Sequence, residues 1–173
     1  ADVKDATERA ILKLRTFHSS HDPETLSVTT LQSDVVLRPF LLACATKSAK
    51  LTLISLSAVQ KLFSLKPLNP IFVATVIGTL RIQAETDNEQ VQLKVLQTLL
   101  LAISPKATGN ESPALEEAQL MKGSLLQSLG ICFRLYSSKS SAIRNTAYAA
   151  LRQIIEALCE RVERSLTKGG KNS

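Results

Sequence analysis

The chain of 173 residues has no tryptophan, and aromatic residues make up only 4% of it. No apolar run approaches the roughly 18–20 residues that a membrane-spanning helix requires, and no basic start followed by an apolar stretch indicates a signal peptide. No segment alternates apolar and polar residues with the two-residue period of a half-buried strand. Glycine-rich phosphate loops, GxSxG elbows and HExxH helices are missing. Together these absences argue against a membrane-spanning protein, a β-protein and an enzyme.

Potential metal ligands are also sparse. The three cysteines, Cys44, Cys132 and Cys159, form no CxxC pair and have apolar neighbours, so we expect reduced, buried thiols in a cytosolic protein. His18 and His21 are three residues apart and could form a metal or acid–base pair, but no cysteine is nearby, which favours two surface histidines at a helix end. We therefore predict no metal and no cofactor.

What the chain does contain is a repeat. Stretches 49–63, 89–103 and 141–155 share one apolar pattern, at offsets of 40 and 52 residues. The positions in register are Leu51, Val91 and Ile143, then Val59, Leu99 and Leu151, then Phe63, Ile103 and Ile155. The 12 additional residues in the second interval correspond to 104–115, which are rich in Pro, Gly, Ser and Asn and indicate a loop. A period of about 40 residues with two helices per unit is typical of HEAT and armadillo proteins.

Capping residues and apolar spacing predict the helices. They cover 3–19, a segment starting at Asp34 or nearer Arg38 because of Pro39, 49–65, a segment starting at Asn69-Pro70, one starting at Asp87 or Asn88, 115–136, and one starting at Ser140. The predicted buried faces include Ala6, Ala10, Ile11, Leu14 and Phe17, then Leu120, Leu125, Leu129 and Phe133, then the stripe from Ile143 to Val162.

These segments predict an all-α fold, an armadillo/HEAT-like right-handed solenoid of about seven antiparallel helices. We expect one domain over residues 1–165 with an exposed loop at 104–116, and a disordered tail at 166–173. Because the chain starts within a predicted helix, we also expect it to be an excised fragment of a longer protein.

Positive charge is concentrated near the C-terminal end. The net charge is +6, and residues 117–173 hold nine basic and four acidic side chains. This asymmetry indicates an acidic partner, an anionic membrane surface or nucleic acid; an ordinary solvated helix face is the alternative. Nucleic acid is the least favoured, since no aromatic residues are interleaved for base stacking.

Five residues of this region form the predicted partner-binding set. Arg134, Lys139, Arg144 and Arg152 could form a basic patch around the last helix pair. Asn145 lies in an apolar segment, where it would need several hydrogen-bond partners if buried. It could bond the turn of a neighbouring unit or hold the backbone of a bound extended peptide, and both alternatives stay open.

Four phrases of the sequence also resemble a known family. They are LRPFLLACATKSAKL (37–51), LRIQAETDNEQVQLKVLQTLL (80–100), ICFRLYSS (131–138) and NTAYAALRQIIEALCERV (145–162). In order and spacing they are similar to the N-terminal DCB (dimerisation and cyclophilin binding) domain of the Mon-two family, relatives of the large Arf guanine-nucleotide exchange factors. The helix that normally precedes the first one is missing here, which could expose an apolar groove on that helix, and the 104–116 loop is longer than expected.

The resemblance implies a function that the residue patterns do not. It implies a non-catalytic scaffold in the cytoplasm, peripheral on Golgi and endosome membranes, acting in endosome-to-Golgi vesicle trafficking. It implies a Dopey-family protein and an Arf-like small GTPase as partners, with an anionic Golgi membrane surface as another contact. One alternative is a regulatory, homodimerising domain of a true large Arf exchange factor. The other is a HEAT-type module for nucleic acid or nuclear transport.

Overall fold

The regular secondary structure in the described part of the chain is entirely α-helical, as predicted. The computed structural model describes residues 2–18, 34–65, 69–103 and 115–169; the side chains of 17, 18, 65, 115–118, 161, 162 and 164–169 are outside this description. Seven helices fall within these ranges: α1 (Val3–His18), α3 (Asp34–Ala45), α4 (Ala49–Leu65), α5 (Pro70–Gln83), α6 (Glu89–Ile103), α8 (Leu115–Tyr136) and α9 (Ser141–Gly169). The predicted 104–116 loop falls largely outside the described residues, and α9 continues past the predicted end at 165.

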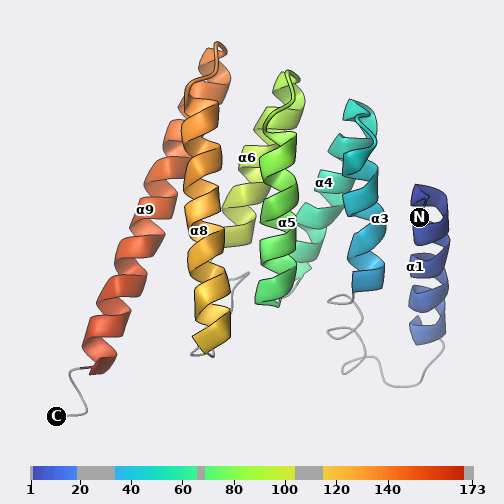
Figure 1. Ribbon diagram of the computed structural model, residues 1–173, viewed down its shortest axis with the longest axis horizontal. Helices are drawn as coiled ribbons and strands as arrows, with labels where there is room; N and C mark the ends of the chain where they lie inside the picture. Colours follow the sequence, from blue (N-terminus) through green and yellow to red (C-terminus); the bar gives the residue numbers. More distant parts are fainter. Residues whose placement is uncertain (1, 19–33, 66–68, 104–114, 170–173) are drawn as a thin grey trace.

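The helices lie in two rows. Figure 1 shows α1, α3, α5 and α8 side by side, with α4, α6 and α9 forming a second row behind them. Helix α6 packs against α4, α5 and α9, and α5 packs against α3, α6 and α8. Contacts therefore join helices within each row and between the rows, whereas α1 packs mainly against α3, and α1 and α9 lie at opposite ends of the arrangement.

The core lies between the rows and is aliphatic. Leu56 and Val59 of α4, Ile77 and Leu80 of α5, and Val95 of α6 are each at most 1% exposed. The C-terminal part of the core comes from Ile131 and Leu135 of α8 and from Ile143, Ala147 and Ile154 of α9. Burial of such side chains stabilises a fold by about 1.5–3 kcal/mol each before entropy is counted.

Three turns within the described ranges, between α3 and α4, α5 and α6, and α8 and α9, repeat the same backbone bonds. The amides of Thr46, Thr86 and Ser138 donate to the carbonyls of Ala43, Gln83 and Leu135, respectively, with N···O distances of 3.2, 3.2 and 3.0 Å. The amides of Thr52, Gln92 and Arg144 donate to the carbonyls of Ser48, Asn88 and Ser140, respectively, at 2.9, 3.0 and 3.1 Å. Both sets keep the offsets of 40 and 52 residues found in the sequence. The internal repeat is therefore present in the turns as well as in the apolar pattern.

Several helix starts follow their predicted capping signals. The side-chain oxygen of Asn69 accepts a hydrogen bond from the amide of Ile71 at 2.8 Å, and Pro70 occupies the first helical position. Asn88, one of the two predicted caps of α6, accepts from the amide of Val91 at 3.0 Å. These bonds pair amides that have no partner within the helix.

Pro39 left two predicted starts for α3, at Asp34 or nearer Arg38, and the structure has the first. Its ring suggested a helix starting near Arg38, yet α3 starts at Asp34 and carries Pro39 inside it. Proline removes one backbone donor from the helix. The additional turn buries Val36 and Leu37, which are 4% and 2% exposed, and this apolar burial offsets the missing hydrogen bond.

Some predicted core positions are exposed instead. Leu120 and Phe133 of α8 are 39% and 60% exposed. Residues four apart advance by about 40° beyond a full turn, so the predicted stripe from Leu125 through Leu129 rotates off the buried face at Phe133. Serines complete the buried face there: Ser124 and Ser128 are 7% and 0% exposed. Ile11 and Leu14 of the predicted α1 face are exposed too. Two positions of the repeat register, Leu51 of α4 and Ile155 of α9, are also exposed.

Candidate partner-binding surface

The five predicted binding residues all lie at or near the junction of α8 and α9. Arg134 is in the last turn of α8, Lys139 is in the connection, and Arg144 and Asn145 are in the first turns of α9, with Arg152 two turns further along. Arg134, Lys139, Asn145 and Arg152 are exposed, whereas Arg144 is half-buried. The structure thus places the set in one region without bringing its charges to one point.

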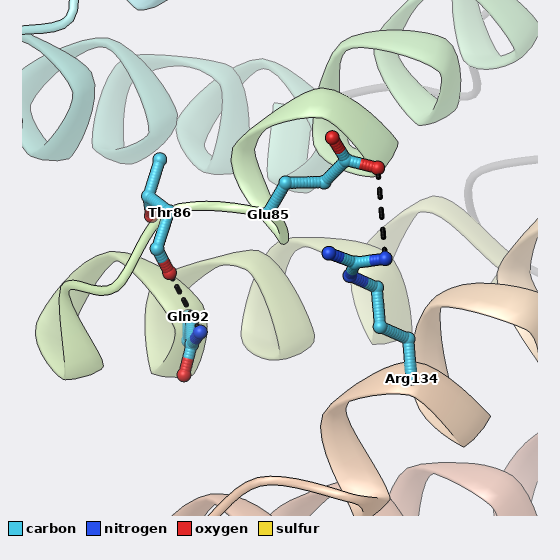
Figure 2. Close-up of polar contacts among 4 residues, drawn as sticks. All are labelled: Glu85, Thr86, Gln92 and Arg134. Carbon is cyan, nitrogen blue, oxygen red and sulfur yellow. Dashed lines mark hydrogen bonds and ion pairs between the residues drawn. The ribbon is translucent and has the colours of Figure 1, made fainter.

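Arg144 serves the turn. Its Nη1 donates to the backbone carbonyls of Ser138 at 3.0 Å and Lys139 at 2.8 Å. Gln92 occupies the position equivalent to Arg144 in the preceding repeat. Its Nε2 donates to the carbonyl of Thr86 at 2.7 Å, as Figure 2 shows. Both side chains pair carbonyls that follow the preceding helix. Arg144 therefore has a structural role that the charge pattern did not predict.

Two of the other arginines are paired with acids. Arg134 Nη1 is 3.7 Å from Glu85 Oε1, which follows α5, and Figure 2 shows the contact between the two segments. Arg152 Nη2 is 3.7 Å from Glu156 Oε1 along α9. All four side chains are more than half exposed, so each pair contributes little to stability and remains accessible to a partner.

Asn145 is exposed, which removes the idea of a buried amide that bonds a neighbouring turn. It was expected to be buried because the segment around it is apolar. The buried face of α9 passes through Ile143, Ala147 and Ala150, and Asn145 lies on the other side of the helix. Its contact with a bound peptide stays a prediction.

Exposed apolar side chains lie on the same two helices as the basic residues, and the sequence pattern did not predict them. Tyr136 and Tyr148 are 49% and 56% exposed, and Phe133 and Ile155 are 60% and 51% exposed. The two tyrosine rings contact each other across α8 and α9, with their centroids 6.5 Å apart. The expectation that no aromatics accompany the basic residues is therefore wrong. Exposed aromatic and arginine side chains in one region are typical of protein-binding surfaces.

Cys44 and Cys132 are buried, so their thiols do not contribute to this surface. Burial raises the pKa of the Cys44 thiol from 9.0 to about 11 and that of Cys132 to about 12, so both stay protonated at neutral pH. Cys159, expected to be buried, is exposed on α9. In the described part of the chain, no three His, Cys, Asp or Glu residues cluster as a metal site; the side chains of His18 and His21 lie outside it.

Among the helices in the described ranges, none combines the length and the apolar character needed to cross a bilayer.

Comparison with known proteins supplies a family. The family model described as "Mon2/Sec7/BIG1-like, dimerisation and cyclophilin-binding domain" matches residues 1–165. The chain is 30% identical over 160 residues to "Protein MON2 homolog" of Homo sapiens and of Xenopus laevis, covering 92% of this chain and 8% of each relative. It is 25% identical over 156 residues to "Brefeldin A-inhibited guanine nucleotide-exchange protein 1" of Rattus norvegicus, covering 82% of this chain and 8% of that protein. The chain thus spans less than a tenth of the length of these relatives.

Proposed function

Because the chain belongs to the DCB family of Mon2/Sec7/BIG1-like proteins, we propose that it is a non-catalytic protein-interaction scaffold in vesicle trafficking. The support is the match of nearly the whole chain to this family and to MON2 homologues. The family description names dimerisation and cyclophilin binding, both of which are interactions between proteins. We further propose that the scaffold acts in the cytoplasm on Golgi and endosome membranes, between endosomes and the Golgi.

The architecture we propose is an armadillo/HEAT-like right-handed solenoid of antiparallel helix pairs, forming one domain over residues 1–165. Two observations support it. The turn bonds recur at offsets of 40 and 52 residues, and in Figure 1 the helices of the front row from α3 onward run upward while those of the back row run downward. Such stacks offer extended surfaces to other macromolecules.

The observation that carries the function is the exposed aromatic and basic surface of α8 and α9. It combines Phe133, Tyr136 and Tyr148 with the cationic side chains of Lys139 and Arg152. An acidic partner, such as an Arf-like small GTPase, fits this chemistry because charge complementarity steers association while aromatic contacts hold the complex. A Dopey-family protein and an anionic membrane surface are further proposed contacts.

Charge reversal tests this surface. We expect the double variant Lys139→Glu and Arg152→Glu to weaken binding of a GTP-loaded Arf-like GTPase at least tenfold, measured by calorimetry, because two attractive contacts become repulsive. Arg144 is left intact to preserve the turn. The matched control is Lys50→Glu with Lys61→Glu on α4, where both lysines are exposed. Equal binding by both double variants would remove the α8–α9 surface from the proposal.

Self-association is a second candidate, favoured by the family description and by the exposed Tyr136–Tyr148 pair. Light scattering across a hundredfold concentration range checks it. A mass that rises with concentration and falls back in Tyr148→Glu supports a dimer through this pair. A constant monomer mass rejects it.

Nucleic-acid binding also has to be tested, because exposed aromatic and basic residues lie on the same helices, α8 and α9. A titration with single- and double-stranded oligonucleotides at two salt concentrations would detect it, because phosphate contacts weaken steeply with salt. Strong, salt-sensitive binding would contradict the trafficking scaffold.

A further inference from the structure

A second exposed apolar surface lies on α5 and α8. Ile71 and Ile82, three turns apart on α5, are both 62% exposed, and Leu126 and Phe133, two turns apart on α8, are 70% and 60% exposed. Residues separated by whole turns share one side of a helix. These four residues define what we call the α5–α8 face.

The two halves of this face adjoin. Helices α5 and α8 pack against each other and run side by side in the same direction in Figure 1. The Glu85–Arg134 contact of 3.7 Å joins their upper ends. Counting back along both helices from this contact places Ile82 within about one turn of the level of Phe133. The exposed apolar residues of α5 and α8 therefore belong to one surface.

Glycines leave this surface open. Gly78 lies between Ile71 and Ile82 on the exposed side of α5, and Gly130 lies between Leu126 and Phe133 on α8. A Cβ added at either glycine, or at Gly123 one turn before Leu126, would meet no atom within 4 Å. Glycine destabilises a helix relative to alanine, and no neighbour in the described part of the chain requires it. The space above these glycines lets another backbone approach closely.

Basic side chains outnumber acidic ones around the described part of the face. Among the described side chains of α5 and α8, the charged ones are Arg81, Lys122 and Arg134, and all three are exposed. Glu85, just after α5, is paired with Arg134; Glu116 and Glu117 lie outside the described side chains. Arg81 and Lys122 thus give the face a positive margin.

We propose that the α5–α8 face binds an amphipathic helix of a partner protein. The apolar stripe of the partner helix lies over the glycines, and carboxylates on either side of that stripe contact Arg81 and Lys122. An apolar stripe set into an apolar surface is a recurring mode of helix recognition, and small residues let the two helices pack closely. The positive margin selects acidic flanks over basic ones. The α5–α8 face shares Phe133 with the α8–α9 surface but does not include Lys139 or Arg152, and it extends the scaffold function with a second partner class.

A pair of designed peptides tests the proposal. The probe is a helical peptide of about 14 residues with Leu and Ala at every third and fourth position and Glu on both flanks; the comparison peptide has Lys in place of each Glu. Titrated into the isotopically labelled 173-residue chain, the Glu peptide should shift the amide signals of Gly78, Gly123 and Gly130. The Lys peptide should bind at least about tenfold more weakly.

Filling the face separates binding from folding. Gly130→Leu should abolish binding of the Glu peptide while keeping or raising the unfolding midpoint, because the new side chain meets no neighbour at Cβ and leucine favours the helix. The matched control is Ala149→Leu, an exposed helical position of α9, which should bind normally. Arg81→Glu with Lys122→Glu should reverse the preference between the two peptides.

Other outcomes would overturn the proposal. These are equal binding of both peptides, normal binding by Gly130→Leu, or no shift at millimolar Glu peptide. Dimerisation of the free chain that Gly130→Leu abolishes would instead assign the face to a second copy. Lys139→Glu with Arg152→Glu should leave peptide binding unchanged, so failure here is distinguishable from failure of the α8–α9 surface.

Discussion

Among the residues that the structure describes, Lys47 is the non-glycine residue with a positive φ, at 60°, in the turn between α3 and α4. A side chain is unfavourable in this left-handed conformation. We expect Lys47→Gly to raise the free energy of unfolding by about 0.5–1 kcal/mol, the strain relief outweighing the added flexibility of the unfolded chain. Urea denaturation measures this.

A neighbouring lysine provides the control for that measurement. Lys50 is exposed in the first turn of α4, where glycine should instead lower the free energy of unfolding by about 0.5–1 kcal/mol. Two changes of the same sign would contradict strain at Lys47.

The three thiols should differ in reactivity. At pH 8, a thiol reagent should modify Cys159 rapidly, since it is exposed, while Cys44 and Cys132 react only when the chain unfolds. Cys159→Ser should remove the fast phase entirely. Mass spectrometry of the labelled peptides assigns each phase, and rapid labelling of Cys132 would contradict the described packing.

The same thiols make stability depend on alkaline pH. The folded chain holds their protons more tightly, because the pKa is raised from 9.0 to about 11 for Cys44 and about 12 for Cys132. Their contribution to stability is therefore complete below about pH 9 and is lost as the pH rises towards 11–12. Replacing both with alanine should flatten this part of the pH profile.

At the scale of the elements, the turn between α8 and α9 depends on one arginine. Arg144→Ala should lower the free energy of unfolding by about 1–3 kcal/mol, because it removes hydrogen bonds to two turn carbonyls. Arg152→Ala should change it by less than about 1 kcal/mol, since it removes only an exposed pair. Guanidinium denaturation of both variants compares them, and equal effects would contradict the structural role of Arg144.

Helix positions were more predictable from the sequence than helix orientations. Asn69 and Asn88 make their capping bonds to amides two or three residues later. The local sequence was therefore sufficient to predict where α5 and α6 start. The side that α8 buries was not predictable from spacing, because Ser124 and Ser128 are buried while Phe133 is exposed. Which face is covered depends on the neighbouring helices, and a single helical pattern does not contain that information.

At the scale of the whole molecule, a buried amide links neighbouring helix pairs. Gln83 of α5 is 6% exposed, and its Nε2 donates to the carbonyl of Cys44 in the last turn of α3 at 3.0 Å. We expect Gln83→Leu to lower the free energy of unfolding by about 1–3 kcal/mol, because a buried carbonyl loses its partner.

The control for this link is Gln97→Leu, at an exposed position of α6, which should change the free energy of unfolding by less than about 0.5 kcal/mol. Thermal unfolding of both variants would measure the difference. A Gln83→Leu protein as stable as the control would show that the bond between the pairs is dispensable.

The candidate surface was only partly predictable for a related reason. Charge density along the sequence indicated the α8–α9 region, and Arg134, Lys139 and Arg152 are indeed exposed there. The Glu85–Arg134 pair and the contact of Tyr136 with Tyr148 join residues whose proximity is a product of helix packing. Periodicity places a residue on its own helix, whereas these contacts depend on the relative positions of two helices.

The arrangement of the rows also bears on how the chain folds. The principal contacts join each helix to those immediately before and after it in the stack, such as α3 with α4 and α5, and α6 with α4, α5 and α9. No long loop closure between distant ends has to precede these contacts, and chains rich in local contacts fold in microseconds to milliseconds. In the solenoid that we propose, folding can start at any helix pair and spread to its neighbours in either direction, so that a chain emerging from the ribosome acquires its structure unit by unit.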